Sequence, residues 1–387
     1  MICQDKVKKV QEILASKEID ALIVLNFIEM LYFCGTLHGN LLLVSKKGQN
    51  KLFSRRAINR TQSEVECGEV ISFKSYKEIK EHLPRNFQKI GFIFDNTPVD
   101  LFEKVMKDLS LNRDQVVDLS RDIKNMKMIK SEKEIKKIKK AGKIVEQAYR
   151  HIHKRIKPGM SENEVAIEIE YLLRKNGHLG ENRFRSYNQI GLLTYVLSDK
   201  SVITAGVHAT PYAGSGTHKM IGVGSSHWII EEGMPFMIDT VGNFEGYHND
   251  TTRTFCFGKP KDQVSAKYND LLEIYHFIIE LLKPGNTCEE VYQKTLEKVA
   301  QMGYKDHFMG LGETRVPFMG HGIGIEVDEF PVFANRFAVP LQAGMTVALE
   351  PKLFFEEIGG VGIESTFLIT ENGNEIMTGL DDQIIII

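Results

Sequence analysis

The chain has 387 residues, with 49 Lys and Arg against 51 Asp and Glu, a net charge of −2 at pH 7 and a pI near 6.7. This length exceeds what one hydrophobic core usually supports, so two domains are expected. The near-neutral charge argues against a general attraction to nucleic acid or anionic lipid, and no apolar run approaches the ~18 residues of a membrane span.

The N-terminus passes directly into a charged helical pattern from Lys6, without the apolar stretch of a secretory signal. A cytoplasmic protein is therefore expected. The cysteines are odd in number and lack paired metal-binding spacing, which predicts reduced thiols; they are Cys3, Cys34, Cys67, Cys256 and Cys288.

The first part of the chain alternates helical and strand patterns. Residues 7–16 read as an amphipathic helix, and residues 21–25, 41–44 and 90–94 as strands, with a polar turn at 45–50. This order predicts an N-terminal α/β domain over residues 1–125.

A second domain is predicted over residues 126–387. Ser131 and Glu134 form a capping box that starts a lysine-rich helix reaching about Lys154. The lysines from 133 to 140 are interleaved with glutamates, which favours a solvated helix face over a nucleic-acid patch.

An internal repeat divides this second domain. Lys157-Pro-Gly-Met-Ser-Glu-Asn-Glu-Val recurs 126 residues later as Lys283-Pro-Gly-Asn-Thr-Cys-Glu-Glu-Val. Each copy opens a helix through a capping box, Ser161 with Glu164 and Thr287 with Glu290. We therefore expect a duplicated half around a pseudo-two-fold axis, although Lys-Pro-Gly before a cap is also a common helix start.

Two acids follow each of these helices in β-like segments. The run ending in Asp239 and the β-branched run from Asn249 to Phe255 predict a hairpin that places Asp239 and Asp250 side by side. Glu350 ends the run from Met345, and Glu364 lies in the run from Val361 to Thr370. These runs flank a turn that contains Gly359-Gly360, which predicts a second hairpin.

His321 completes the candidate cluster, in Gly320-His-Gly-Ile-Gly324. A single strand carboxylate is more often solvated or at a sheet edge than a ligand, but four together with an imidazole are costly to bury without a cation. Such ligands suit Mn, Co, Zn or Fe, in a pair that activates a water for hydrolysis.

On these motifs the chain resembles the pita-bread metallopeptidases, which include Xaa-Pro aminopeptidases, prolidases, methionine aminopeptidases and the metal-free creatinases. The resemblance rests on Ile238-Asp-Thr-Val-Gly242, Asn249-Asp-Thr-Thr-Arg-Thr254, Gly320-His-Gly-Ile-Gly324, Leu349-Glu-Pro351 and Gly362-Ile-Glu364. It implies an α/β (α+β) chain with a creatinase-like N-terminal domain and a pita-bread catalytic domain.

The resemblance also implies roles for these residues. Asp239 would bind one metal, Asp250 and Glu364 would bridge two, and His321 and Glu350 would bind the other, while Glu350 also passes a proton to the leaving amine. The implied protein is a homodimer in which the N-terminal domain serves dimerisation and substrate entry.

Two positions depart from the family pattern. Asp328 stands where Xaa-Pro peptidases usually carry a second histidine, and Gly362 where many relatives carry arginine. Recognition of the scissile carbonyl must therefore be supplied differently. The family places a substrate histidine in a loop upstream of the first metal aspartate, which makes His218 the candidate catalytic residue there, and His208 and Asp328 candidate substrate-binding residues.

The sequence thus predicts a two-metal exopeptidase, with Mn favoured, that hydrolyses the Xaa-Pro bond of short peptides. A creatinase-like metal-free C–N hydrolase, a non-catalytic pita-bread binding protein and a metallohydrolase with another substrate remain as alternatives. Neither a nucleic acid nor a membrane is expected as a partner. The apolar end, Ile384-Ile-Ile-Ile387, is expected to dock on the protein's own surface or on a dimer interface.

Overall fold

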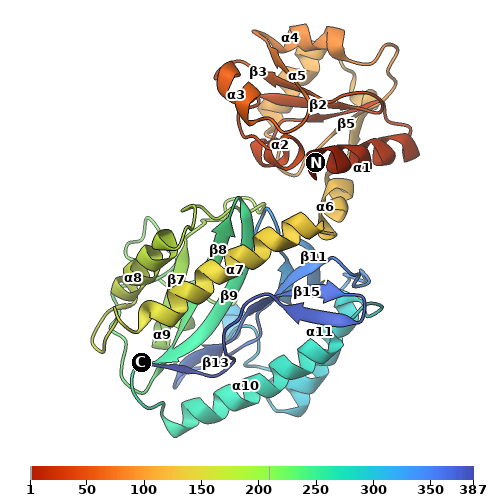
Figure 1. The fold of residues 1–387 in the computed structure, drawn as a ribbon. Helices are drawn as coiled ribbons and strands as arrows, with labels where there is room; N and C mark the ends of the chain where they lie inside the picture. The colour runs from red at the N-terminus through yellow and green to blue at the C-terminus, as the bar shows by residue number, and fades with distance from the viewer. Residues whose placement is uncertain (1, 209) are drawn as a thin grey trace. The chain divides into compact units, whose positions relative to one another are not determined.

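The computed structural model describes residues 2–208 and 210–387, and the chain forms two compact units, residues 1–127 and 128–387 (Figure 1). Both units are mixed α/β. In the described residues no helix combines the length and apolar character needed to cross a bilayer.

The first unit is built on one six-stranded sheet in the order β4-β3-β2-β1-β5-β6. Strands β1, β2 and β3 pair antiparallel, and β4, β5 and β6 join in parallel. The strands are β1 (Ala21–Val24), β2 (Leu41–Ser45), β3 (Lys51–Ser54), β4 (Glu69–Ser72), β5 (Ile90–Phe92) and β6 (Val116–Asp118).

Helices alternate with these strands. They are α1 (Ile2–Ser16), α2 (Phe27–Cys34), α3 (Ile58–Glu64), α4 (Tyr76–Ile79), α5 (Val99–Leu109) and α6 (Ser120–Met128). The predicted helix at 7–16 and strands at 21–25, 41–44 and 90–94 are confirmed as α1, β1, β2 and β5, because their apolar residues fill the core of this unit.

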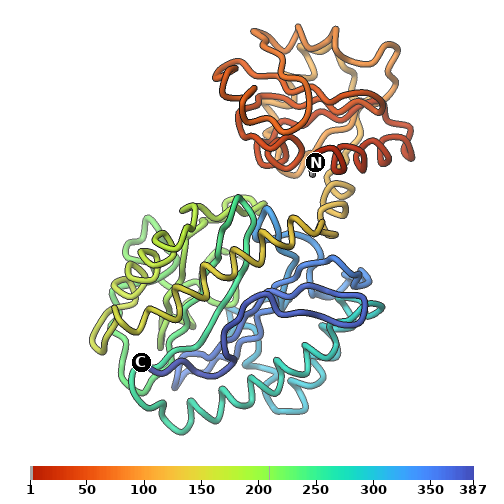
Figure 2. The backbone as a smooth tube through the Cα atoms, in the orientation of Figure 1, coloured from red at the N-terminus to blue at the C-terminus, as the bar shows by residue number. Residues whose placement is uncertain are grey.

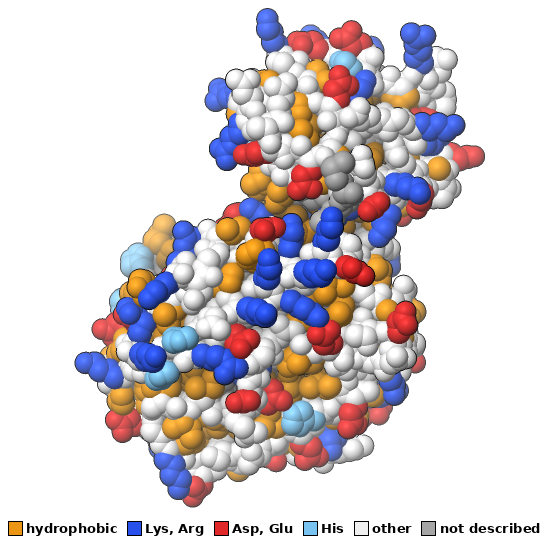
Figure 3. Space-filling view, viewed as in Figure 1, with side chains coloured by type: hydrophobic (Ala, Val, Ile, Leu, Met, Phe, Trp, Pro, Cys, Tyr) orange, Lys and Arg blue, Asp and Glu red, His pale blue; other side chains and the backbone are white. Residues whose placement is uncertain are grey.

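The second unit begins with α7 (Glu132–Ile152), which starts at the predicted Ser131 capping box. Lys and Arg side chains gather over this helix on the face shown in Figure 3. Lys137 pairs with Glu245 and Lys139 with Glu375, so this helix presents an exposed, partly ion-paired face.

Two helix pairs cover the strands of this unit. Helix α7 packs on β8 and β9, and α8 (Glu162–Lys175) on β7. Helix α11 (Cys288–Gln301) packs on β11, and α10 (Asp262–Leu281) on β13 and β14. Each half has its own buried apolar cluster, as a duplication predicts.

The first sheet has the order β17-β9-β8-β7 and the second β11-β10-β12-β15-β16, with β13-β14 as a separate pair. The first sheet contains β7 (Thr194–Ser198), β8 (Pro235–Phe244), β9 (Tyr247–Cys256) and β17 (Ile385–Ile386), with α9 (Asp199–Val202) after β7. The others are β10 (Phe318–Gly322), β11 (Glu329–Ala334), β12 (Thr346–Leu349), β13 (Lys352–Phe355), β14 (Gly359–Gly362), β15 (Ser365–Thr370) and β16 (Gly373–Ile376).

The C-terminal isoleucines dock on the protein's own surface. Strand β17 pairs in parallel with β9, Ile385 opposite Phe255, and the end of the chain runs beside β9 in Figure 2. Ile384, Ile385 and Ile387 pack against the buried clusters, and Ile386 is exposed. The expected docking is confirmed within this chain, because β9 offers an unpaired sheet edge there.

Candidate metal centre

The hairpin of β8 and β9 carries the first two acids. Asp239 pairs with Thr252, and Asp250 with Val241. Residues opposite one another share a face and side chains alternate along a strand. Asp239 and Asp250 therefore lie on one face of the predicted hairpin, on adjacent strands, as diagonal neighbours.

The second pair of acids lies at a break in the sheet. Leu349 pairs with Ser365 at the end of β12 and β15, and Lys352 pairs with Gly362 in β13 and β14. Glu350 and Glu364 stand between these two ladders. The predicted hairpin is present as β13 and β14, and its ladder is interrupted near Pro351, which has no N–H to donate.

The two halves are joined at this break. The Glu364 N–H donates to the Thr252 carbonyl at 3.0 Å, and the Asp250 N–H to the Thr366 hydroxyl at 2.9 Å. Arg253 is fully buried and its guanidinium donates to the Glu364 carbonyl at 2.6 Å. Arg253 therefore ties the backbones of the two halves together.

His321 is brought to the acids by β10. A Cβ at Gly322 would lie 2.0 Å from the Phe330 carbonyl oxygen, and one at Gly320 would lie 2.5 Å from that of Ala348. The glycines on either side of His321 thus let β10 fit between β11 and β12. Their role in this motif is close backbone packing.

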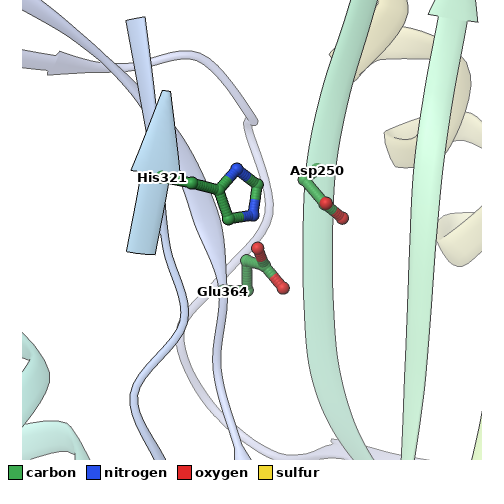
Figure 4. A group of neighbouring side chains, drawn as sticks. All are labelled: Asp250, His321 and Glu364. Atoms are coloured by element: carbon green, nitrogen blue, oxygen red, sulfur yellow. The ribbon is translucent and has the colours of Figure 1, made fainter. Parts of the chain in front are cut away.

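Three side chains converge on one point. Asp250, His321 and Glu364 each offer a ligand atom, and these atoms lie within 4.8 Å of one another. Figure 4 shows the imidazole facing the two carboxylates, with Asp250 on one side and Glu364 below it. One nitrogen and two hard oxygens at this spacing suit a divalent transition metal.

The hydrogen bonding of Glu364 fits a cation at this point. Its Oε2 accepts the Thr252 hydroxyl at 2.9 Å, while its Oε1 is buried and has no hydrogen-bond partner among the described residues. A buried carboxylate oxygen left without a donor is costly, and an ion would satisfy it.

Burial and mutual repulsion perturb the acids. Burial, followed by the charge of Glu364, raises the pKa of Asp239 to about 8. The same two causes raise the pKa of Asp250 well above its usual value, and burial raises that of Glu364. Cations stabilise the ionised form of such a cluster.

Lys352 was not anticipated from the sequence. It is fully buried, and its Nζ lies 2.7 Å from Glu350 Oε2 and 3.4 Å from Glu364 Oε2. Burial alone would lower its pKa, but the charges of Glu350, Glu364 and Asp239 outweigh burial and raise it. The sequence did contain a signal for this contact. Lys352 stands two residues after the predicted ligand Glu350 and begins an apolar strand, where a lysine needs a charged partner.

Tyr212 is a second residue that the sequence analysis missed. Its hydroxyl donates a short hydrogen bond to Asp239, and its ring centroid lies 4.9 Å from Lys352 Nζ. Tyr212 lies in the glycine-rich segment before β8. Nothing in the local sequence pattern there sets it apart from other aromatic residues.

The loop histidines have other surroundings. His218 is exposed, and its Nδ1 accepts the Met220 N–H at 3.2 Å within its own turn. His208 is half-buried, and its Nε2 is buried without a partner among the described residues. Their suggested roles stay predictions.

Asp328 holds a loop. Its carboxylate accepts the Arg185 N–H at 2.6 Å and the Ser186 N–H at 2.9 Å, and the Ser186 hydroxyl in a short bond. Both oxygens are thereby engaged, which supports an anchoring role for Asp328; direct contact with substrate stays a prediction.

Comparison with known proteins gives two family matches. The model of metallopeptidase family M24 matches residues 136–371, and that of the creatinase/prolidase N-terminal domain matches residues 6–129. Together they cover both units of the chain.

Relatives match over the full length. The chain is 29% identical to a Xaa-Pro dipeptidase of Pyrococcus horikoshii, over 99% of both chains. Among solved structures, the P. horikoshii prolidase superposes with a TM-score of 0.81 at 28% identity, covering 98% of this chain and 100% of that one. A Xaa-Pro dipeptidase of Bacillus anthracis superposes at 0.83 and 26%, covering all of both chains.

Proposed function

Because the chain belongs to metallopeptidase family M24, with its pita-bread catalytic fold behind a creatinase/prolidase N-terminal domain, we propose that it is an exopeptidase that hydrolyses the Xaa-Pro bond of short peptides. The convergence of Asp250, His321 and Glu364 carries the proposal. The relatives' names, Xaa-Pro dipeptidase and prolidase, support the substrate.

The acid cluster is proposed to hold two divalent ions. Asp239, Asp250 and Glu364 would bind one, and Asp250, His321, Glu350 and Glu364 the other. When bound, such ions would lower the pKa of a water towards neutral pH and would polarise the scissile carbonyl. Mn is the proposed metal, and Co, Zn and Fe suit the same ligands.

Glu350 is proposed to move the proton. Its carboxylate lies at the break between β12 and β13, where its Oε2 accepts from Lys352. From this position Glu350 would accept a proton from the attacking water and pass it to the departing amine. The surrounding burial keeps bulk water from competing for that proton.

The assembly and location are proposed from the same resemblance. A cytoplasmic homodimer is expected, with the N-terminal domain at the subunit contact. Neither a nucleic acid nor a membrane is proposed as a partner.

Hydrolysis of a small peptide panel tests the function. The metal-stripped protein is given Ala-Pro, Ala-Pro-Ala and the matched control Ala-Ala, with and without Mn²⁺, and products are read by mass spectrometry. Metal-dependent release of alanine from the proline peptides alone is expected. Cleavage of the dipeptide or of the tripeptide separates dipeptidase from aminopeptidase.

A metallohydrolase with another substrate is the second candidate. Gly362, in the place of the arginine that many relatives carry, and the anchoring of Asp328 to residues 185 and 186 favour it. Metal binding without cleavage of either proline peptide would support it and contradict the first candidate.

A further inference from the structure

Lys352 is a cation built into the acid cluster. Its side chain has no exposed surface, and its Nζ lies between Glu350 Oε2 at 2.7 Å and Glu364 Oε2 at 3.4 Å. The ring of Tyr212 lies close to the same ammonium. The ammonium of Lys352 therefore contacts carboxylate oxygens that would otherwise be available to bind a metal ion.

The space for Lys352 exists because residue 362 is glycine. The two residues are directly paired across β13 and β14. A Cβ at Gly362 would lie 2.8 Å from Lys352 Cγ, 3.4 Å from its Cδ and 2.5 Å from Met237 Sδ. A larger side chain at 362 would therefore displace the lysine stem.

The ligands are consequently divided into two sets. Asp250, His321 and Glu364 Oε1 are open to an ion. Glu350 is held by Lys352, and Asp239 by the Tyr212 hydroxyl. An ion at the first set displaces neither donor, and Glu350 becomes a further ligand for it only when Lys352 withdraws. The ion assigned to Asp239, Asp250 and Glu364 must displace the Tyr212 hydroxyl and must bind beside the ammonium that contacts Glu364 Oε2.

We propose that Lys352 competes with the second of the two divalent ions, so that the first set of ligands fills first and the second ion binds only when the ammonium withdraws. The proposal rests on the ligand assignment of the proposed function. It makes Lys352 a positioning residue that sets how many ions the site holds at a given metal concentration.

Metal binding in the absence of peptide tests the proposal. Mn²⁺ is titrated into metal-free wild type, Lys352→Met and the control Lys127→Met by calorimetry, and bound metal is counted by mass spectrometry. Met keeps the length of the stem and removes the charge. Lys127 is also a buried lysine, paired with Glu29 at 3.5 Å in the first unit, so its variant controls for the general effect of removing one.

We expect Lys352→Met to increase the affinity for the second Mn²⁺ ion by about tenfold or more, because repulsion between nearby charges is strong inside a protein. The first ion should gain less than the second, since Asp250, His321 and Glu364 Oε1 are open to it with Lys352 in place. Lys127→Met should match the wild type. Lys352→Gln, which also removes the charge, should repeat the result if the Met variant does not fold.

An unchanged second affinity in a folded, neutral Lys352 variant would overturn the proposal, and so would an equal gain in Lys127→Met. Failure of every form to bind Mn²⁺ would overturn it together with the ligand assignment. Failure to cleave proline peptides, with the expected binding pattern intact, would contradict only the proposed function.

Discussion

The two halves of the catalytic unit share one plan but differ where they meet the acids. Both open a helix with the same capping box, Ser161 with Glu164 and Thr287 with Glu290. Both caps form an isolated bridge to a later segment, Ser161 to Ile229 and Thr287 to Pro340.

The strands that follow are unequal. Strands β8 and β9 pair without interruption from Phe244 opposite Tyr247 to Pro235 opposite Cys256. The matching ladder of the second half breaks at Pro351, and the break admits Lys352 into the cluster. A duplicated frame can therefore keep its ligands in place while one half acquires a new charged residue among them.

An acid in the first turn of each helix is the other contrast. Glu162 is fully buried and accepts five hydrogen bonds of 2.7 to 3.0 Å from Ser198, Ser201 and Ser226. Glu289 is only partly buried and accepts one, from the Arg336 N–H. The first half is thus held by a polar network around Glu162, whereas Glu289 forms no such network with the described residues.

The largest expected effect concerns the broken ladder. Glu350→Ala should lower turnover by about 10² to 10⁴, the usual contribution of a positioned acid or base, while the protein stays folded. Glu357→Ala, an exposed position in the β13–β14 hairpin, is the matched control and should keep full activity. Steady-state kinetics on Ala-Pro measures both, and an active Glu350→Ala enzyme would refute the role of Glu350.

Glu162→Ala should destabilise the protein strongly. It leaves the donors of three serines unsatisfied in the core, which we expect to cost about 3 kcal/mol or more. Glu289→Ala should cost about 0.5 kcal/mol or less, since it is a near-surface substitution. Urea denaturation compares them, and equal losses would remove the contrast between the halves.

Acid should weaken the first half through His178. This buried ring donates from Nε2 to the Val241 carbonyl at 2.9 Å and accepts the Gly180 N–H at Nδ1, and burial lowers its pKa below the ordinary 6.5. A lowered folded-state pKa means that its stability contribution is complete above pH 6.5 and is lost as the pH falls through the folded pKa.

Thermal melting of the wild type and His178→Gln from pH 7.5 to 5 measures this effect. The melting temperature of the wild type should fall more steeply with acid than that of the variant. Parallel pH profiles would show that His178 does not contribute.

The smallest expected effect tests what the halves share. Ser161→Ala and Thr287→Ala each remove a cap whose hydroxyl accepts a backbone N–H, at 3.3 and 3.1 Å. Each should cost about 1 kcal/mol. Similar losses in urea denaturation would show that the caps are energetically equivalent; a negligible loss at either one would break the equivalence.

Much of the frame follows from local sequence. Capping boxes at Ser131, Ser161 and Thr287, and the β-branched run at Asn249 to Phe255, predict their elements because hydrogen bonding and side-chain alternation within a few residues decide them. The two acids and the histidine that converge were likewise among the predicted ligands, since buried carboxylates ending apolar strands are rare without a cation.

The sequence by itself determined the two repeated helix starts, the strands and the chemical type of the cluster. Only the tertiary structure decided that Lys352 faces Glu350 through the space left by Gly362, that Tyr212 bonds to Asp239, and that Asp328 anchors residues 185 and 186. Local periodicity states which face a side chain occupies, whereas the partner of a buried charge depends on segments far apart in the chain that packing brings within a few ångströms.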